Sequence, residues 1–192
     1  MTTGEVDLSR FANPEFERGA SKATELAWLL VRKWFFENSV LPINKPRRAL
    51  LARFGAKIGV GAVIKPRVRI HLPWRLTMGD HVWLGEESYI LNLAPVTIGN
   101  NVCISQRAFL CTGSHDWSDP AFRLLTKPIT IEDGAWVSAD VFVGPGVTIG
   151  RNAVATAGSV VLHDLPPQMI CSGNPCVPVK PRVIRESSPI AR

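Results

Sequence analysis

The sequence lacks the cysteine spacings of metal and disulfide proteins. No two of its four cysteines form a CxxC pair, so neither a structural zinc site nor a disulfide framework is expected. We interpret each of them as a small buried hydrophobe. No N-terminal stretch has the pattern of a signal peptide, and we therefore expect a cytoplasmic protein with free thiols. The cysteines are Cys103, Cys111, Cys171 and Cys176.

Long apolar runs and nucleic-acid-binding patterns are also missing. The most apolar stretch, residues 21–37, is interrupted by Arg32 and Lys33 and is too short and too charged to span a bilayer. The net charge of +6 comes without a basic stripe interleaved with aromatics, so no nucleic acid partner is expected. The basic residues near the two ends either solubilise the chain or bind anions such as phosphates and acidic lipid headgroups. They are Lys45, Arg47, Arg48 and Arg53, and then Lys180, Arg182, Arg185 and Arg192.

What the sequence does contain is a six-residue repeat of aliphatic positions. A helix places apolar residues three or four apart and a simple strand alternates them, so a period of six fits neither element. It fits one short strand plus one corner, with an aliphatic side chain pointing inward each time, which is typical of a parallel β-helix. The repeat is clearest at Ile131, Val137, Val143, Ile149, Ala155 and Val161.

Upstream, the repeat is organised in longer units. The pairs Ile58-Gly59, Met78-Gly79 and Ile98-Gly99 lie twenty residues apart, which is one triangular coil of three hexads plus two extra residues. We expect the extra residues at corners, near Pro73-Trp74 and Pro95-Val96, where proline removes no ladder hydrogen bond. A longer interval before Ile131 predicts a loop over residues 115–127 that leaves the coil. Loops of this length inside a repeat are usually functional or disordered.

The chain is predicted to have three parts: a helical segment (1–55), the β-helix (56–168) and a C-terminal extension (169–192). Within the first part, residues 21–37 read as a helix, and a second helix is expected over 47–54. The helical segment either covers the open strand edges of the β-helix or lies at a membrane surface as an aromatic and basic anchor.

Candidate chemistry lies where the chain leaves the coil. His115 stands at the start of the predicted loop, and a histidine in a cleft can accept a proton near neutral pH. Its orienting partner is open: Glu86 and Glu87 are one coil earlier, and a backbone carbonyl would serve equally. Trp117 could stack on a sugar ring or close the loop.

Several motifs resemble those of the hexapeptide-repeat acyltransferases. The likeness covers residues 20–185 and is strongest to the galactoside/maltose acetyltransferase branch, within it to the colanic-acid type O-acetyltransferases of exopolysaccharide clusters. It implies a left-handed parallel β-helix, a homotrimer with sites between subunits, and direct acetyl transfer from acetyl-CoA to a hydroxyl of a saccharide. The motifs are Phe54 to Gly59, Gly113-Ser114-His115-Asp116, Ala157 to Val161, Asp164 to Pro167, and Gly173 to Cys176.

The resemblance also implies roles for individual residues. His115 matches the catalytic base, a role that contributes about 10²–10⁴ in rate. Asn92 matches a site asparagine near the acceptor and thioester, although its residue type alone favours an amide that closes a turn. Asp116 and Trp117 are expected to bind the acceptor. The positions expected along acetyl-CoA are Ser138, Ala139, Ala157, Leu162, His163 and Lys180, with Ser138 or the Ala139 N–H as oxyanion donor.

Two positions depart from the family pattern: His163 stands where a basic residue is expected, and Val177 stands in place of an arginine.

Two other functions stay open. A zinc-dependent hydration enzyme would need three converging histidines, which His71, His81 and His163 do not supply by spacing, so no metal is expected. A non-catalytic scaffold would not need the long loop. The acceptor is expected to be nucleotide- or lipid-linked, with peripheral contact at the inner face of the membrane.

Overall fold

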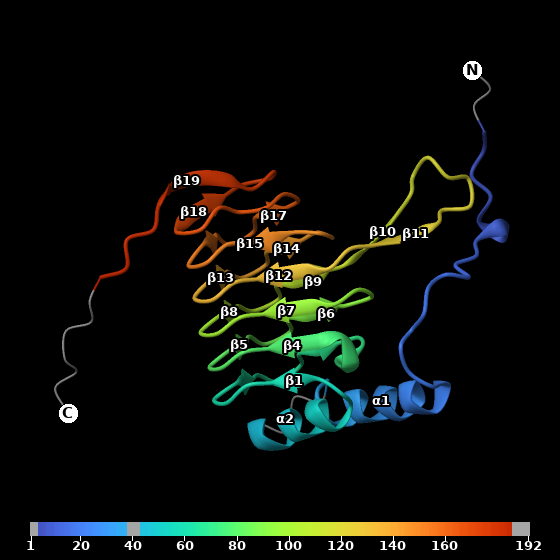
Figure 1. Cartoon of the computed structure of the whole chain (residues 1–192), viewed down its shortest axis with the longest axis horizontal. Coiled ribbons are helices and arrows are strands. Elements are labelled where there is room, and N and C mark those ends of the chain that lie inside the picture. Colours follow the sequence, from blue (N-terminus) through green and yellow to red (C-terminus); the bar gives the residue numbers. More distant parts are fainter. Residues whose placement is uncertain (1–3, 38–42, 186–192) are drawn as a thin grey trace.

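The computed structural model describes residues 4–37 and 43–185, and most of them form a parallel β-helix (Figure 1). Short strands turn through three sheets, and each coil stacks on the previous one to form a three-sided prism. The predicted fold class is confirmed. Two helices, α1 (Lys22–Phe35) and α2 (Asn44–Arg53), lie at the end where the first coil begins.

The three sheets take their strands from successive coils, in parallel register throughout the prism. Sheet A contains β1 (Lys57–Ile58), β4 (Leu76–Met78), β7 (Val96–Ile98), β12 (Ile129–Ile131) and β15 (Thr148–Ile149). Sheet B contains β2 (Val63–Ile64), β5 (Trp83–Leu84), β8 (Cys103–Ile104), β13 (Trp136–Val137), β16 (Val154–Ala155), β18 (Met169–Ser172) and β19 (Val177–Pro181). Sheet C contains β3 (Arg69–Ile70), β6 (Tyr89–Leu91), β9 (Phe109–Cys111), β14 (Phe142–Val143) and β17 (Val160–Val161).

The six-residue repeat is the inner lining of the prism. Along sheet B, for example, Leu84 pairs in register with Ile104, and Ile104 with Val137. These side chains are fully buried, as are the aliphatic residues that head the hexads on the other two sheets, except for the partly buried Ile58 in the first coil. Burial of these stacked columns provides most of the apolar stabilisation that a β-helix can obtain.

One corner of the prism, between sheets B and C, carries a column of residues in the left-handed backbone region. Arg67, Glu87, Arg107 and Asp140 have φ values of 60°, 62°, 56° and 57°. Non-glycine residues adopt this conformation at some cost, so each tight corner imposes local strain. Side chains of the column pair between coils, Arg67 with Glu87 at 2.9 Å and Arg107 with Asp140 at 2.7 Å.

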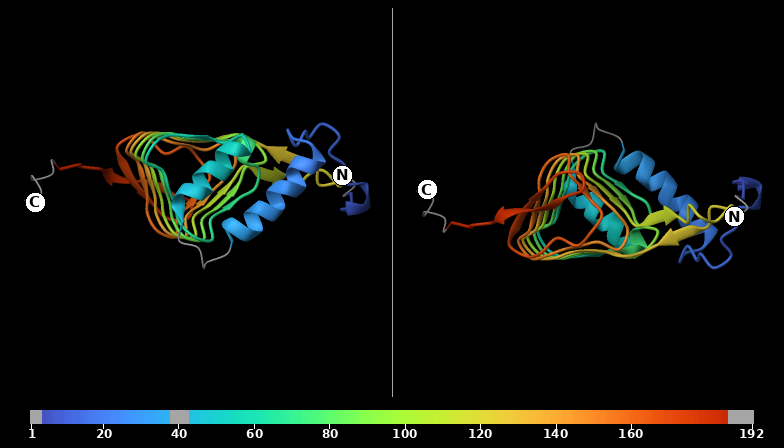
Figure 2. Two further views of the ribbon diagram at one scale, coloured as in Figure 1. Left: turned by 90° about the horizontal axis from the view of Figure 1, so that it is seen from below. Right: turned by 90° about the horizontal axis from the view of Figure 1, so that it is seen from above.

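Helix α2 covers the open end of the first coil (Figure 2). Its Leu51 is fully buried, and the guanidinium of buried Arg47 donates to the carbonyl oxygens of Phe35 and Ile64. Arg48 donates to the carbonyl of Gly59 at 3.2 Å. Arg47 and Arg48, two of the four basic residues of the N-terminal group considered as anion ligands, therefore hold α2 on the first coil. The helix begins three residues before the predicted start.

The predicted loop is a two-stranded hairpin that projects from the prism between sheets C and A. Strands β10 (Gly113–His115) and β11 (Leu124–Thr126) pair antiparallel, with His115 opposite Leu124. We call residues 113–126 the arm. The arm and β19 leave the prism in opposite directions (Figure 2). The extra residues expected near Pro73-Trp74 form a short 3₁₀ helix, η2 (Pro73–Arg75), at a corner of the prism.

The last coil differs from the prediction in one respect. Strand β18 lies in the predicted C-terminal extension but still stacks on β16 in parallel register. Strand β19 then reverses direction and pairs antiparallel with β18. No helix among the described residues is both long and apolar enough to cross a membrane.

Candidate active site

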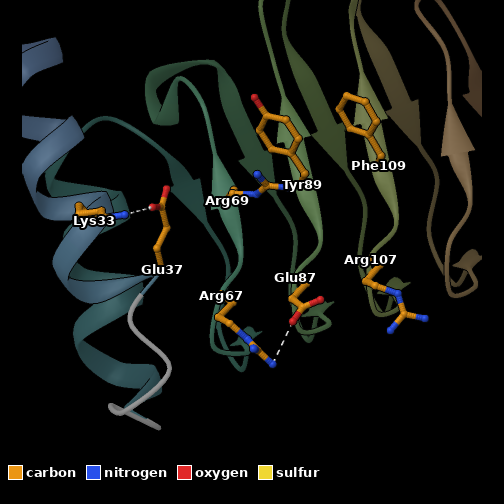
Figure 3. Close-up of a pocket in the computed structure, with 8 residues that line it drawn as sticks. All are labelled: Lys33, Glu37, Arg67, Arg69, Glu87, Tyr89, Arg107 and Phe109. Atoms are coloured by element: carbon orange, nitrogen blue, oxygen red, sulfur yellow. Dashed lines mark hydrogen bonds and ion pairs between the residues drawn. The ribbon is translucent and has the colours of Figure 1, made fainter.

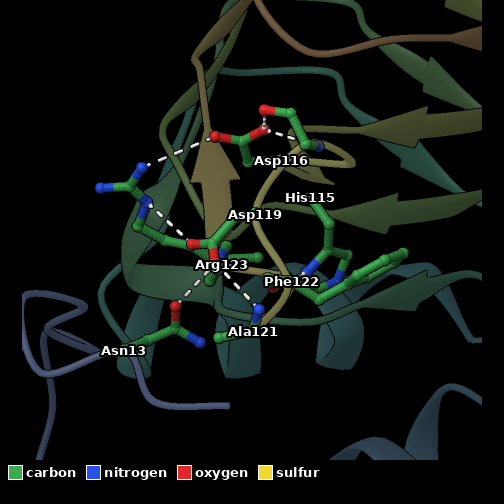
Figure 4. A network of polar contacts seen from close by, with 9 residues as sticks. Asn13, His115, Asp116, Asp119, Ala121, Phe122 and Arg123 are labelled. Carbon is green, nitrogen blue, oxygen red and sulfur yellow. Dashed lines mark hydrogen bonds and ion pairs between the residues drawn. The ribbon is translucent and has the colours of Figure 1, made fainter. Parts of the chain in front are cut away.

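His115 ends strand β10, and its side chain is exposed on the arm (Figure 4). Its Nδ1 lies 2.7 Å from the carbonyl oxygen of Phe122. A carbonyl oxygen can only accept, so Nδ1 carries the proton in this bond. Nε2 is then the basic nitrogen and is free to accept a proton from another molecule. The backbone carbonyl is the orienting partner, and Glu87 is not, because it pairs with Arg67 at the B–C corner.

The tip of the arm is held by its own acidic side chains. Asp116 accepts hydrogen bonds from the Ser118 N–H at 3.0 Å and the Ser118 hydroxyl at 2.5 Å. The Ser118 bonds lower the pKa of Asp116, and the charge of Arg123 lowers it further. Asp119 accepts from the Ala121 N–H and also lies near Arg123. Asp116 thus shapes the arm in this structure, and its predicted contact with an acceptor stays a prediction.

An N-terminal segment, residues 7–16, packs along the arm. The Leu124 N–H donates to Asn13 Oδ1 at 2.9 Å, and the Asp7 N–H donates to the Pro120 carbonyl at 2.9 Å. The Phe11 ring lies 5.9 Å from the His115 imidazole, centroid to centroid. The sequence analysis missed this segment. Asn13 and Leu124 are 111 residues apart, and no local pattern joins them.

Asn92 lies one coil below the start of the arm, since Leu91 pairs in register with Cys111. It is fully buried at the corner after β6, where Oδ1 accepts the Leu72 N–H at 2.8 Å and Nδ2 donates to the Leu72 carbonyl at 2.6 Å. Both ends of the amide therefore close the turn of the coil below. This is the turn-closing role suggested by its residue type, and the site role taken from the resemblance stays a prediction.

Three of the positions expected to contact the donor lie in one groove on sheet B. Ser138, Ala139 and Ala157 line a hollow of about 530 Å³ together with Trp136 and Arg182. The indole N–H of Trp136 donates to the Ser105 hydroxyl at 2.9 Å, which fixes the ring as one wall of the groove. Small side chains at the other wall allow an extended ligand to approach the backbone closely.

The groove offers unused backbone donors, since the N–H groups of Gln106, Ala139 and Ala157 have no acceptor among the described residues. The Ser138 N–H donates to the Ala155 carbonyl at 3.0 Å within the ladder and is not free for an oxyanion. The Ala139 N–H has no hydrogen-bond acceptor among the described residues. Of the oxyanion donors considered from the sequence, the Ser138 N–H is engaged, while the Ser138 hydroxyl and the Ala139 N–H remain available.

The remaining positions expected at the donor lie elsewhere on the chain. Leu162 and His163 follow β17 at the corner between sheets C and A, and both are exposed. Lys180 is exposed on β19, while Arg182 lines the groove and donates to the carbonyls of Gly134 and Asn152. Within one chain these positions divide between two corners. Trp117, also expected at the acceptor, is 86% exposed.

A larger hollow, about 670 Å³, lies on sheet C beside the end of α1 (Figure 3). The rings of Tyr89 and Phe109 stack in it at 5.0 Å, and the Arg69 guanidinium lies over the Tyr89 ring. None of the residues expected at the site lines it. Across the described ranges, no three His, Cys, Asp or Glu side chains are grouped so that they could hold a metal ion.

A coiled prism with a histidine on a projecting arm and an apolar groove on one face defines the hexapeptide-repeat class of β-helix proteins. No family model matches the chain. WcaF of Escherichia coli (strain K12), whose name assigns it to the acetyltransferases of colanic acid biosynthesis, is 42% identical over 180 residues, which is 94% of this chain and 99% of WcaF. Galactoside O-acetyltransferase of the same strain is 34% identical over 147 residues, 73% of this chain and 68% of that enzyme.

Among solved structures, a hexapeptide-repeat acetyltransferase of Vibrio cholerae O1 biovar eltor, in complex with acetyl coenzyme A, superposes with a TM-score of 0.80. It is 25% identical, and the superposition covers 92% of this chain and 97% of the other. The chain therefore belongs to the hexapeptide-repeat acetyltransferases, a family of enzymes. A purely structural scaffold, one of the functions left open by the sequence, is set aside.

Proposed function

We propose that this protein transfers an acetyl group from acetyl-CoA to a hydroxyl of a saccharide during surface polysaccharide biosynthesis. The observation that carries the proposal is the hydrogen bond between His115 Nδ1 and the Phe122 carbonyl, because it leaves Nε2 as an exposed general base. The relatives support the acceptor class: one is named for galactosides and another for colanic acid biosynthesis. The acetyl-CoA complex of the Vibrio cholerae enzyme supports the donor.

In the proposed reaction, His115 Nε2 takes the proton of the acceptor hydroxyl while the hydroxyl oxygen attacks the thioester carbonyl. The tetrahedral intermediate carries a negative oxygen, which a fixed N–H donor stabilises. The unpaired Ala139 N–H is the donor that we assign to it. Collapse of the intermediate expels the CoA thiolate, which takes up the proton held by His115, so that acetyl passes directly to the acceptor without an acetyl-enzyme.

The donor would lie in the sheet B groove beside Ser138, Ala139 and Ala157, with its pantetheine arm along Trp136. Leu162, His163 and Lys180 stay in the proposal as contacts for the remainder of CoA, and Arg182 is added to them. These residues lie at different corners of one prism. A neighbouring copy that brings its arm corner to this groove would join them in one site.

A homotrimer supplies such a neighbour, and the outer faces of the prism support it. Sheet A presents a column of threonines, Thr77, Thr97 and Thr130, that suits contact with water. Sheets B and C present large apolar side chains, including Trp83 at 55% and Trp136 at 43% exposure. Apolar faces on two sides and a polar face on the third fit a ring in which sheet B of one copy meets sheet C of the next.

Thiol release from acetyl-CoA against a panel of sugars and lipid- or nucleotide-linked glycans tests the reaction. We expect release that depends on the acceptor and falls about 10²–10⁴-fold in His115→Ala. His81→Asn is the matched control, since His81 is exposed at a corner and its left-handed φ of 57° suits asparagine. Activity that survives in His115→Ala would refute the base assignment.

Light scattering tests the assembly. A molar mass three times the chain mass of 21.1 kDa is expected. A second experiment mixes His115→Ala with Trp136→Ala subunits after unfolding and refolding them together. The rates are compared at an acetyl-CoA concentration well below the KM, where Trp136→Ala is slow. If each site takes its base and its groove from different copies, the mixture is more active than the average of the two variants, whereas sites confined to one chain give no gain.

A further inference from the structure

The outer face of α1 is apolar although it faces away from the prism. Leu26, Leu29, Leu30 and Trp34 are 59%, 49%, 56% and 66% exposed. They lie at spacings of three and four, so they form one continuous stripe along the helix. The opposite side is anchored by Trp28, which is buried and donates from its indole N–H to the Ile70 carbonyl at 3.1 Å. A surface helix normally presents polar residues where this stripe lies.

The charges around the stripe are mixed, but each carboxylate is paired. Lys22 begins the helix, and Lys33 lies beside Trp34 with its side chain 74% exposed. The carboxylates of this region are half-buried and occupied: Glu25 pairs with an arginine at 2.6 Å, and Glu37 pairs with Arg32 at 3.2 Å and with Lys33 at 3.4 Å. The exposed face therefore offers hydrocarbon and ammonium groups without an unpaired carboxylate.

We infer that this stripe of α1 docks on the surface of a membrane that contains anionic lipids. A 14-residue helix is about 21 Å long, so it can lie within the interface but cannot cross the hydrocarbon core. Interfacial helices combine an apolar face, aromatic residues and flanking lysines in this way. The leucines and Trp34 would enter the acyl boundary while Lys22 and Lys33 meet headgroup phosphates.

Charge complementarity favours this occupant over a second copy of the chain. Three further cationic side chains are exposed at the same end of the prism, Lys45, Arg53 and Lys57, on α2 and β1 (Figure 1). A second copy would have to offer free carboxylates to this end. On the prism, Glu87, Asp133 and Asp140 are already paired with arginines of their own chain, whereas exposed carboxylates such as Glu86 and Asp164 form no ion pair within the described ranges. An anionic lipid surface, in contrast, presents a continuous layer of unpaired negative charge.

The placement has a consequence for the site, which rests on the proposed function. The segment of residues 7–16, which packs along the arm, continues down the chain into α1 (Figure 1). Docking through α1 would hold the arm at a fixed height above the lipid headgroups. A saccharide carried on a lipid is the acceptor that this arrangement would present to His115.

Flotation with vesicles tests the inference without any acetyl transfer. Purified full-length protein is expected to float with phosphatidylcholine vesicles that contain phosphatidylglycerol, and not with phosphatidylcholine alone. Leu26→Gln/Leu30→Gln should lower the partition coefficient about tenfold or more. Lys22→Gln/Lys33→Gln should lower it about fivefold for each charge removed. The matched control is Val177→Gln/Val179→Gln, which removes two exposed apolar side chains from β19 at the far end of the prism.

Either of two flotation results would overturn the inference: no flotation with anionic vesicles, or flotation that the α1 variants leave unchanged. A lower molar mass of the Leu26→Gln/Leu30→Gln variant in light scattering would also overturn it, because the stripe would then be a contact between copies. Thiol release with a soluble acceptor separates this inference from the proposed function. We expect it to be unchanged in both α1 variants, and its absence in the wild type would count against the reaction and not against docking.

Discussion

The prism and the arm are both made of short strands, but they are stabilised in opposite ways. In the prism, each inner strand pairs on both sides, and its inward side chain joins a fully buried column. The arm has a single pair of strands, its His115 is exposed, and its contacts come from residues 7–16. The repeat therefore supplies stability, and the irregular insertion supplies the candidate chemistry. Damage to one should leave the property of the other nearly unchanged.

The largest effect is expected from a cavity in the prism. Ile104→Ala removes a fully buried side chain from the middle of the sheet B column and should lower the free energy of unfolding by about 2–5 kcal/mol. The activity of the folded fraction should stay near that of the wild type. Urea denaturation measures the first and thiol release the second. Thr97→Val, on the exposed face of sheet A, is the control and should change stability by less than about 0.5 kcal/mol.

A smaller effect should follow from removing a wall of the groove. Trp136→Ala should raise the KM for acetyl-CoA about tenfold, equivalent to the loss of about 1.4 kcal/mol of binding, with stability little changed. Initial rates over a range of acetyl-CoA concentrations give the value. Trp34→Ala, which removes an equally large exposed ring from α1, should leave this KM unaltered with a soluble acceptor. An unchanged KM in Trp136→Ala would place the donor elsewhere.

Loosening the arm should have a still smaller effect. Asn13→Ala removes the acceptor of the Leu124 N–H, a neutral hydrogen bond that contributes about 0.5–1.5 kcal/mol. We expect kcat to fall about two- to tenfold while the midpoint of urea unfolding hardly moves. Asn13→Asp keeps an acceptor oxygen and should restore most of the rate. Equal losses in stability and activity would show that the arm and the prism unfold together.

The smallest effect concerns pH. Because the Ser118 hydrogen bonds lower the pKa of Asp116 from its ordinary value of 3.8, the ionised carboxylate stabilises the arm. This contribution is present above the ordinary pKa and is lost as the pH falls through the lowered one. The protection of the Ser118 amide against exchange, relative to an unfolded chain at the same pH, should therefore fall at acid pH before that of the prism does. In Asp116→Asn, this pH-dependent change at Ser118 should disappear, while the strands of the prism keep their protection.

The prism could be predicted from sequence because each hexad obeys the same local rule. One inward aliphatic residue per strand produced the period, and residues such as Ile131 and Val143 are buried as expected. The handedness came only with the resemblance. The contacts of the arm could not be predicted, since Asn13, Phe11 and His115 meet through folding rather than through spacing. For Asn92 the residue type correctly indicated a turn, and its match to a family site stays a prediction.

The column of charged residues at the B–C corner also favours the correct register between successive coils. Arg67, Glu87, Arg107 and Asp140 alternate in sign from one coil to the next. If the chain paired with a slip of one whole coil, Arg67 would meet Arg107 and Glu87 would meet Asp140. Stacked repeats are otherwise nearly interchangeable, because each coil presents the same apolar lining to its neighbours. The corner thus distinguishes the coils during folding, a task that the hydrophobic core cannot perform.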